Sequence, residues 1–415
     1  MNGVQALPST RIPTLNPRNS SEFLFHLPLG AFGYSSGWAD KPFSLNRQPD
    51  LAPRRLVRLE QVGIAYFVPF EKGDFDSHEL REFPFFKKRL LSDGNRSPGP
   101  IGLSSGGGSA IVEWEGRTIK VKRCGLAERG FVKEPFSSYA MFEKDGHHFE
   151  SSFAVKGGLM ELSSALHECK TLAEIRREDL CAAYKPLGVA VVTELPDTHW
   201  PTEAIGAVIV EIASDLRVDE LVCMAISPLM ATLFESGVLS YDPESEYFDC
   251  QGLSVEAFVL QAQPTFEKLQ LIGRSAGSAY RRLHNRGYLR GVGSSWFGNE
   301  VVDANGSISM VDLDGGFGKM TEFSVEIAER MRQIEVQQYL AESYTFLTEM
   351  RPAALSFLGA SFVEAFREGY QADYHGIPSD LVAQVIDEHL AVWPIVSRGF
   401  HFPNDDLTGF ACANP

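Results

Sequence analysis

The sequence of 415 residues has no apolar run long enough to span a membrane, and no basic segment followed by an apolar one at its N-terminus. A membrane-spanning helix needs about 20 predominantly apolar residues, and a secretory signal needs the second pattern. We therefore expect a protein that is neither inserted in a membrane nor secreted. Basic residues are also scarce. The sequence has 38 Lys and Arg but 54 Asp and Glu, which gives a net charge of −16. This balance argues against nucleic acid and anionic membrane as main partners, since phosphate groups bind basic faces.

Cysteine is sparse as well. The six cysteines are widely spaced and form no CxxC pair. This spacing argues against a disulfide framework and against a cysteine metal cluster, and we expect a cytoplasmic, reducing environment. The sequence also lacks HExxH and lacks GxGxxG after a predicted strand. These absences argue against a zinc protease of that type and against a dinucleotide-binding fold.

Three segments of different character divide the chain. Residues 1–57 are rich in Pro, Ser, Asn and Arg and are predicted to form an N-terminal arm or extension. Residues 58–213 contain strand patterns, including a hairpin signal at Glu115-Gly116, and one helical pattern. Residues 214–415 are mostly helical, with apolar periodicity over 265–285, 322–350, 352–372 and 379–399. This order of strand and helix patterns along the chain predicts an α+β, bilobal protein with a strand-rich N-terminal lobe and a mostly helical C-terminal lobe.

The most informative stretch lies between residues 298 and 316. Asn299 and Asp312 lie thirteen residues apart and are joined by a predicted hairpin that turns at Asn305-Gly306. Amide and carboxylate oxygens are ligands that magnesium accepts in proteins. Asp314 competes with Asp312 because it also precedes a glycine, and both could face the metal.

Candidates for a phosphate site come earlier in the chain. Gly106, Gly107, Gly108 and Ser109 form a glycine-rich turn before a strand, where backbone can approach phosphates because no Cβ intrudes. Lys120 and Lys122 follow and share one face of the next strand, since side chains alternate along a strand.

A helix predicted over 159–178 supplies an acidic partner for such a lysine. Leu162, Leu166 and Cys169 lie on one apolar face, and Glu168 lies beside them. Glu161 is the fallback.

With these residues, the region from 276 to 316 resembles the protein-kinase-like superfamily, including its aminoglycoside phosphotransferase branch. The resemblance implies ATP and magnesium as cofactors, with magnesium on Asn299 and Asp312. It also implies a connector over 209–221 whose backbone carries the adenine hydrogen bonds. The segments TIKVKRCG and GGLMELSSALHECK are similar to the selenoprotein O family. That similarity assigns the phosphate lysine to Lys122 and its acidic partner to Glu168, and the family transfers AMP.

One position departs from the kinase-like pattern. Where the related loops read HGDxxxxN, this chain has Val292-Gly293-Ser294. A serine hydroxyl is not a base near neutral pH, and base catalysis of this type is worth about 10²–10⁴ in rate. Three possibilities follow: another base among Asp314, Asp303 and Glu300, a reversed ATP attacked at its α-phosphate, or no chemistry at all.

The sequence therefore predicts an ATP- and magnesium-dependent transferase of atypical, kinase-like mechanism. It would move AMP or phosphate to a protein side chain or to a small metabolite. The alternative is a catalytically inactive pseudokinase that binds a nucleotide or a partner and regulates it.

Overall fold

The computed structural model combines helices and strands, which confirms the expected mixture of α and β structure. It describes residues 23–25, 56–58, 63–69, 101–104, 109–114, 116–122, 143–144, 147–148, 160–194, 205–242, 247–250, 254–290, 298–303, 305–313, 318–349, 353–372 and 376–399. In this part of the chain, none of the helices combines the length and apolar character that crossing a membrane requires.

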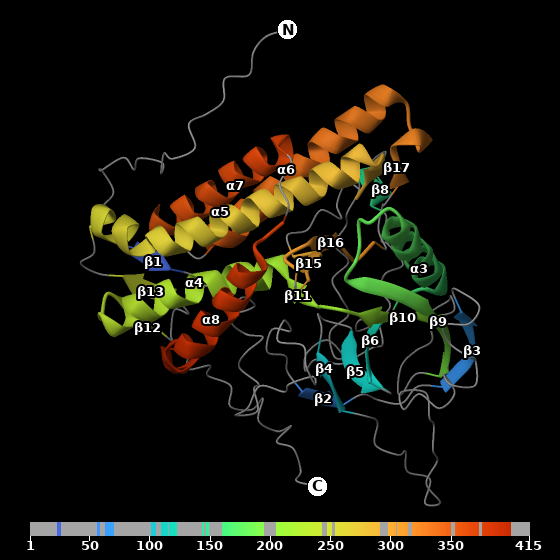
Figure 1. Ribbon diagram of the computed structural model, residues 1–415, viewed down its shortest axis with the longest axis horizontal. Helices are drawn as coiled ribbons and strands as arrows, with labels where there is room; N and C mark the ends of the chain where they lie inside the picture. The colour runs from blue at the N-terminus through green and yellow to red at the C-terminus, as the bar shows by residue number, and fades with distance from the viewer. Residues whose placement is uncertain are drawn as a thin grey trace, which may run out of the picture. The chain divides into compact units, whose positions relative to one another are not determined.

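A seven-stranded antiparallel sheet has the strand order β2-β4-β5-β6-β10-β9-β3 (Figure 1). Its strands are β2 (Leu56–Arg58), β3 (Gly63–Pro69), β4 (Ile101–Ser104), β5 (Ala110–Trp114), β6 (Arg117–Lys122), β9 (Tyr184–Glu194) and β10 (Ile205–Ile212). The hairpin expected at Glu115-Gly116 is confirmed, because β5 pairs with β6 across Gly116, whose φ is 75°. Strand β6, which carries both candidate lysines, lies between β5 and β10.

Helix α3 (Leu162–Arg177) packs against β9 and β10 (Figure 1). Gly206 on β10 permits this close approach. A Cβ at this position would lie 2.8 Å from the Cβ of Ala165 and 3.2 Å from the Cα of Leu162. The helix turns Glu168 inward, where it is fully buried, and leaves Leu166 40% exposed. The close packing thus positions an acidic side chain of α3 beside the sheet.

A second, three-stranded sheet positions the other half of the site. Its order is β11-β15-β16, with β11 at Leu216–Arg217, β15 at Glu300–Val302 and β16 at Ile308–Met310. Strands β15 and β16 form the hairpin predicted at Asn305-Gly306, and Gly306 has a φ of 74°. The hairpin brings Asn299 and Asp312 to the same end, where the N–H of Val311 donates to the carbonyl of Asn299 at 3.0 Å.

The remaining helices are α4 (Val218–Glu235), α5 (Val255–Asn285), α6 (Val325–Glu349), α7 (Ala353–Gln371) and α8 (Ser379–Gly399). Of these, α6, α7 and α8 agree closely with the predicted periodic segments, whereas α4 matches none of these segments. Helix α5 begins before the predicted residue 265 and continues through Pro264. Short strands and one 3-10 helix complete the described chain: β1 (Phe23–Phe25), β7 (Glu143–Lys144), β8 (His147–His148), β12 (Leu239–Asp242), β13 (Tyr247–Cys250), β14 (Tyr288–Leu289), β17 (Gly318–Lys319) and η3 (Met320–Glu322).

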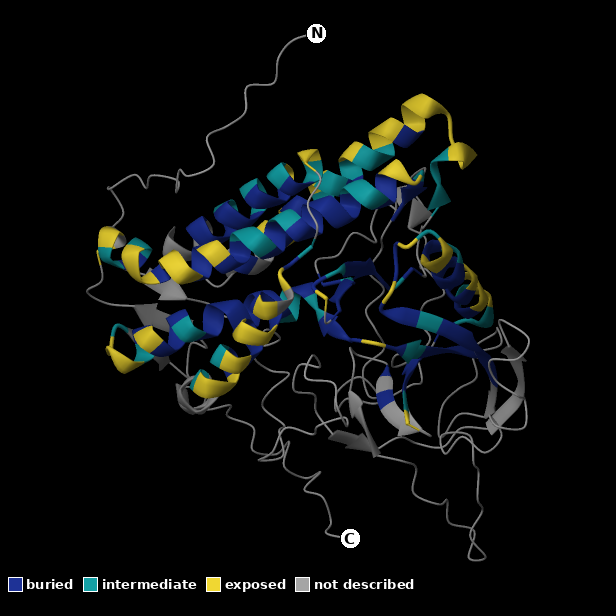
Figure 2. Ribbon diagram, in the orientation of Figure 1, coloured by how far each residue is buried: buried dark blue, intermediate teal, exposed yellow. Residues whose placement is uncertain are grey.

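Glycines let α5 and α7 approach one another closely. A Cβ on Gly277 would lie 2.0 Å from the carbonyl oxygen of Phe366, and one on Gly369 would lie 1.9 Å from that of Arg274. Figure 2 shows buried residues running along both helices. Backbone contact between the two helices therefore depends on these small residues.

The chain divides into two compact units. One, the helical unit, includes the described residues of Asp219–Arg281 and Tyr339–Pro403. The other, the sheet unit, includes those of Gly33–Val218 and Arg282–Gln338. The predicted division at residue 213 lies near the end of the first sheet-unit segment, but the hairpin of β15 and β16 belongs with the sheets and not with the helices. All candidate site residues that the structure describes therefore lie within one unit.

Candidate functional site

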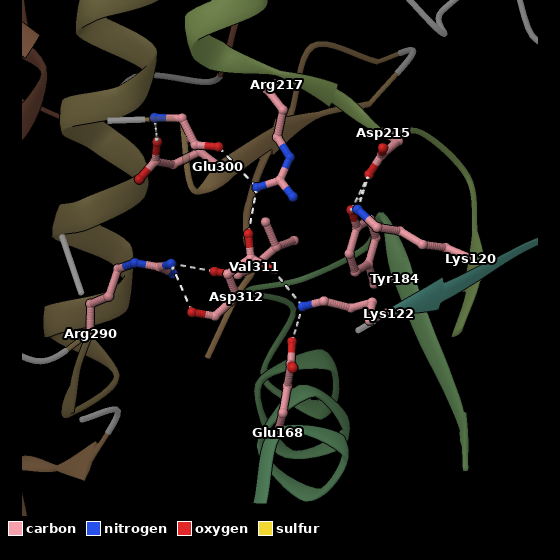
Figure 3. A network of polar contacts seen from close by, with 11 residues as sticks. Lys120, Lys122, Glu168, Tyr184, Asp215, Arg217, Arg290, Glu300, Val311 and Asp312 are labelled. Atoms are coloured by element: carbon pink, nitrogen blue, oxygen red, sulfur yellow. Dashed lines mark hydrogen bonds and ion pairs between the residues drawn. The ribbon is translucent and has the colours of Figure 1, made fainter. Parts of the chain in front are cut away.

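Lys122 lies at the centre of a buried network of charges (Figure 3). It is the last residue of β6 and is 2% exposed. Its Nζ donates to Oε1 of Glu168 on α3 and, at 2.6 Å, to Oδ1 of Asp312 after β16. These partners are 46 and 190 residues away in the sequence. The fold therefore gathers three of the predicted site residues from a strand, a helix and a loop.

Asp312 is held by cations on both oxygens of its carboxylate. Lys122 binds Oδ1, and Nη1 of Arg217 donates to Oδ2 at 2.7 Å. Burial opposes ionisation, but the charges of Arg217, Lys122 and Lys120 hold the pKa of Asp312 well below its usual range. The carboxylate is thus ionised and ion-paired at neutral pH.

The backbone of Asp312 is also constrained. Its φ is 55°, in the left-handed region that non-glycine residues seldom adopt. The buried guanidinium of Arg290 donates to the carbonyl of Val311 and, at 3.2 Å, to that of Asp312 itself. A residue in this conformation costs about 1–3 kcal/mol and persists where its surroundings fix it, often at functional sites.

Lys120 lies in a neighbouring cluster. Its Nζ donates to Oδ1 of Asp215 at 2.7 Å and to the hydroxyl oxygen of Tyr184 at 2.8 Å. The Tyr184 hydroxyl donates to the same carboxylate oxygen, and all three side chains are fully buried. Burial lowers the pKa of Lys120 to about 8, although Asp215 opposes this shift. Burial, together with Asp215, raises the pKa of Tyr184 well above its ordinary value.

The lowered pKa of Lys120 predicts that the stability of the folded protein depends on pH in an unusual way. Because the pKa of Lys120 falls from 10.5 to about 8 in the folded protein, the unfolded chain binds more protons between these values. Stability contributed by Lys120 therefore rises with pH across this window, by at most about 3 kcal/mol. Urea unfolding of wild type and Lys120→Met at about pH 8 and about pH 10 measures the effect. We expect wild type to gain stability relative to the variant, and a constant difference would contradict the prediction.

The predicted connector, residues 209–221, contributes a side chain to the Lys120 cluster. The sequence led us to expect adenine hydrogen bonds from the backbone of 209–221. Asp215 lies in this connector, and its buried carboxylate accepts hydrogen bonds from a strand lysine and a tyrosine. Of the two candidate lysines, Lys122 is therefore the one that joins Glu168 and Asp312, and Lys120 joins the connector.

Several predicted residues lie outside the described part of the chain. They are Gly106, Gly107, Gly108, Ser294 and Asp314. Ser109 is described and buried directly before β5. Glu161 precedes α3 and has intermediate exposure, and Glu168 from the same region is the residue that bonds Lys122. Asn299 precedes β15 and has intermediate exposure.

Asp303 and Glu300, two of the acids predicted as substitute bases, accept hydrogen bonds from the backbone. Oδ1 of Asp303 accepts the N–H groups of Asn305 and Ser307, each at 2.9 Å, and so stabilises the hairpin turn. Glu300 is fully buried, and its carboxylate accepts the N–H of Gly298 at 3.3 Å. Both carboxylates therefore have a role in holding the hairpin.

The predicted magnesium site can be tested against this geometry. Magnesium binds hard oxygen ligands, typically one or two carboxylates. Here each oxygen of Asp312 already accepts a hydrogen bond from a protein cation, Lys122 or Arg217. In this arrangement Asp312 does not fit a metal ion, because the adjacent charges of Lys122 and Arg217 repel a further cation on the same carboxylate. Among the described residues, no group of three or more His, Cys, Asp or Glu side chains is arranged to hold a metal.

Four residues of the network were not predicted from the sequence. They are Tyr184, Asp215, Arg217 and Arg290. A signal existed for two of them, because Asp215 and Arg217 flank the buried Leu216 in the predicted connector. The sequence matches no protein-family model and no curated protein, so function has to be inferred from the geometry of this network.

Proposed function

We propose that the chain has a bilobal, protein-kinase-like fold and is an ATP-dependent transferase of atypical mechanism. It moves AMP or phosphate to a protein side chain or a small metabolite in the cytoplasm. The observation that carries the proposal is the convergence of Glu168 and Asp312 on Lys122. A lysine that is buried and fixed by acids from a helix and a loop is arranged to hold phosphate oxygens.

Each residue of the network has a role in this proposal. Lys122 neutralises phosphate charge, and Glu168 orients its ammonium group. Asp312 fixes the positions of Lys122 and Arg217. In phosphoryl transfer, positioning and charge neutralisation supply most of the catalysis, so such a network is the main requirement.

The reaction has two possible leaving groups. An acceptor oxygen that attacks the γ-phosphorus breaks the bond to the β–γ bridging oxygen and releases ADP. Attack at the α-phosphorus releases pyrophosphate and leaves AMP on the acceptor. In both cases the acceptor loses a proton to a base, and Ser294 stands where related enzymes have an aspartate for this purpose.

A second candidate is a nucleotide-binding regulator without transferase activity. It is favoured by the engagement of both oxygens of Asp312 with Lys122 and Arg217. A site that binds without reacting needs the lysine and its acids but no base.

Label transfer from ATP distinguishes these functions. Wild-type protein is incubated with cell lysate and ATP labelled on either the α- or the γ-phosphate. We expect label in a protein or metabolite, from the α position for AMP transfer or from γ alone for phosphate transfer. Asp312→Ala should remove this transfer, because Lys122 and Arg217 lose the carboxylate that aligns them. Absence of transfer from wild type, while ATP still binds, would leave the regulator.

A further inference from the structure

Arg217 lies beside the position predicted for magnesium. It belongs to β11, where the ladder pairs it with Val301 of β15 and so fixes its backbone. Its Nη1 donates to the carbonyl of Gly298 at 2.9 Å and to Oδ2 of Asp312 at 2.7 Å. A protein cation therefore joins the backbone of Gly298 to the carboxylate of Asp312 (Figure 3).

Lys122 approaches the same carboxylate through its other oxygen, at 2.6 Å. The two cationic side chains come from different sheets, β6 and β11, and converge on one anion. They are largely buried, with 2% of the Lys122 side chain and 13% of the Arg217 side chain exposed. The pKa of Arg217 is raised well above its ordinary value, because Asp312 and its neighbours outweigh the opposing effect of burial. Arg217 thus remains charged at any physiological pH.

A phosphate group has the same chemistry as the anion between these side chains. It offers negatively charged oxygens, and a guanidinium binds phosphate and carboxylate through the same N–H donors. An arginine provides a fixed charge and directed hydrogen bonds without the hydration shell of magnesium. A phosphate that replaces the Asp312 carboxylate is therefore held by two protein cations without a metal ion.

On the premise of the proposed function, we infer that Arg217 takes the place of the divalent metal. The nucleotide phosphates replace the Asp312 carboxylate between Lys122 and Arg217, and their binding does not depend on magnesium. The sequence-based prediction of magnesium on Asn299 and Asp312 is thereby replaced by an arginine on the connector.

Calorimetric titration of the full-length protein with ATP, in excess EDTA and in magnesium chloride, tests this inference. We expect equal affinity in both buffers. Arg217→Gln should weaken ATP binding in EDTA by about 10- to 100-fold, because a charged hydrogen bond to phosphate is lost. Magnesium should restore part of this loss in the variant, since removal of the guanidinium exposes Oδ2 of Asp312 to a metal.

Arg117→Gln is a matched control, because Arg117 lies in the same unit and pairs with Glu211, at 2.6 Å, and with neither Lys122 nor Asp312. It should bind ATP as wild type does. The comparison of wild type in the two buffers needs no variant, so it decides the inference even where Arg217→Gln fails to fold. Binding that requires magnesium in wild type, or tightens in Arg217→Gln, overturns the inference and leaves the proposed function standing. No ATP binding in either buffer overturns both.

Discussion

The Glu168→Ala variant should lose about 1.5–3 kcal/mol of local stability, because a buried charged hydrogen bond to Lys122 is broken. Glu168 is fully buried, and its carboxylate bonds the ammonium of Lys122, which is itself 2% exposed. Without Glu168, Lys122 keeps Asp312 but loses the partner that fixes it to α3. Hydrogen exchange read peptide by peptide measures the opening free energy of α3 and β6, where we expect the loss.

Two variants control this prediction. Glu168→Gln keeps the shape and an acceptor oxygen, so its loss should be smaller than that of Glu168→Ala. Glu174→Ala removes a carboxylate from the same helix that pairs with Lys319 in a partly exposed position. Solvent screens such a pair, and we expect little change. If the opening free energy of α3 and β6 is the same in Glu168→Ala and Glu174→Ala, the buried pair does not hold α3 against β6.

The Lys122→Met variant should bind ATP about 100-fold more weakly than wild type, because a charged hydrogen bond to phosphate contributes about 1.5–3 kcal/mol. Methionine preserves much of the length and volume of the side chain, so the change removes mainly the charge. It also leaves Glu168 and Asp312 without their shared cation. Calorimetric titration with ATP measures the loss, and circular dichroism confirms that the variant is folded.

Lys170→Met serves as the control for this loss, because Lys170 is exposed on α3. Its affinity for ATP should equal that of wild type. Lys120→Met is the sharper comparison, since Lys120 lies two residues away on the same strand and bonds Asp215 and Tyr184 instead. The loss should be larger at Lys122 than at Lys120. Equal losses would contradict the assignment of Lys122 as the phosphate lysine.

Local patterns were sufficient to predict most of the elements. The hairpin turns at Gly116 and Gly306 follow from glycines that adopt positive φ, where other residues are strained. The long helices α6, α7 and α8 follow from apolar periodicity, and their bounds differ little from the predicted ones. These features depend on neighbours in sequence, so a pattern can reveal them.

Helix α3 shows where periodicity fails. The apolar pattern placed Leu166 on the inward face, yet Leu166 is 40% exposed and Glu168 is buried. The orientation of α3 is determined by its close packing at Gly206 and by the ion pair with Lys122. Both are long-range contacts, and a helical pattern with few apolar residues does not specify them.

Only part of the candidate site could be predicted, because the other part depends on long-range contacts. Lys122, Glu168 and Asp312 could be proposed from residue type and order along the chain. Arg290 could not, and Arg217 could be proposed only as a charged residue of the connector, because the importance of both arises from contacts with Asp312 across the fold. The left-handed backbone of Asp312 is likewise a property of its surroundings, and no turn signal in the sequence required it.

The central claim is that Lys122 contacts the phosphates of a bound nucleotide, and an acyl phosphate derivative of ATP tests it most directly. In this reagent the terminal phosphate carries an acyl group, which a nearby lysine amine attacks, releasing ATP and forming a stable amide. Mass spectrometry of the digested protein then identifies the labelled lysine. We predict that Lys122 is labelled and that excess ATP prevents the labelling. Labelling at other lysines with Lys122 unmodified, or labelling that ATP does not reduce, would contradict the claim.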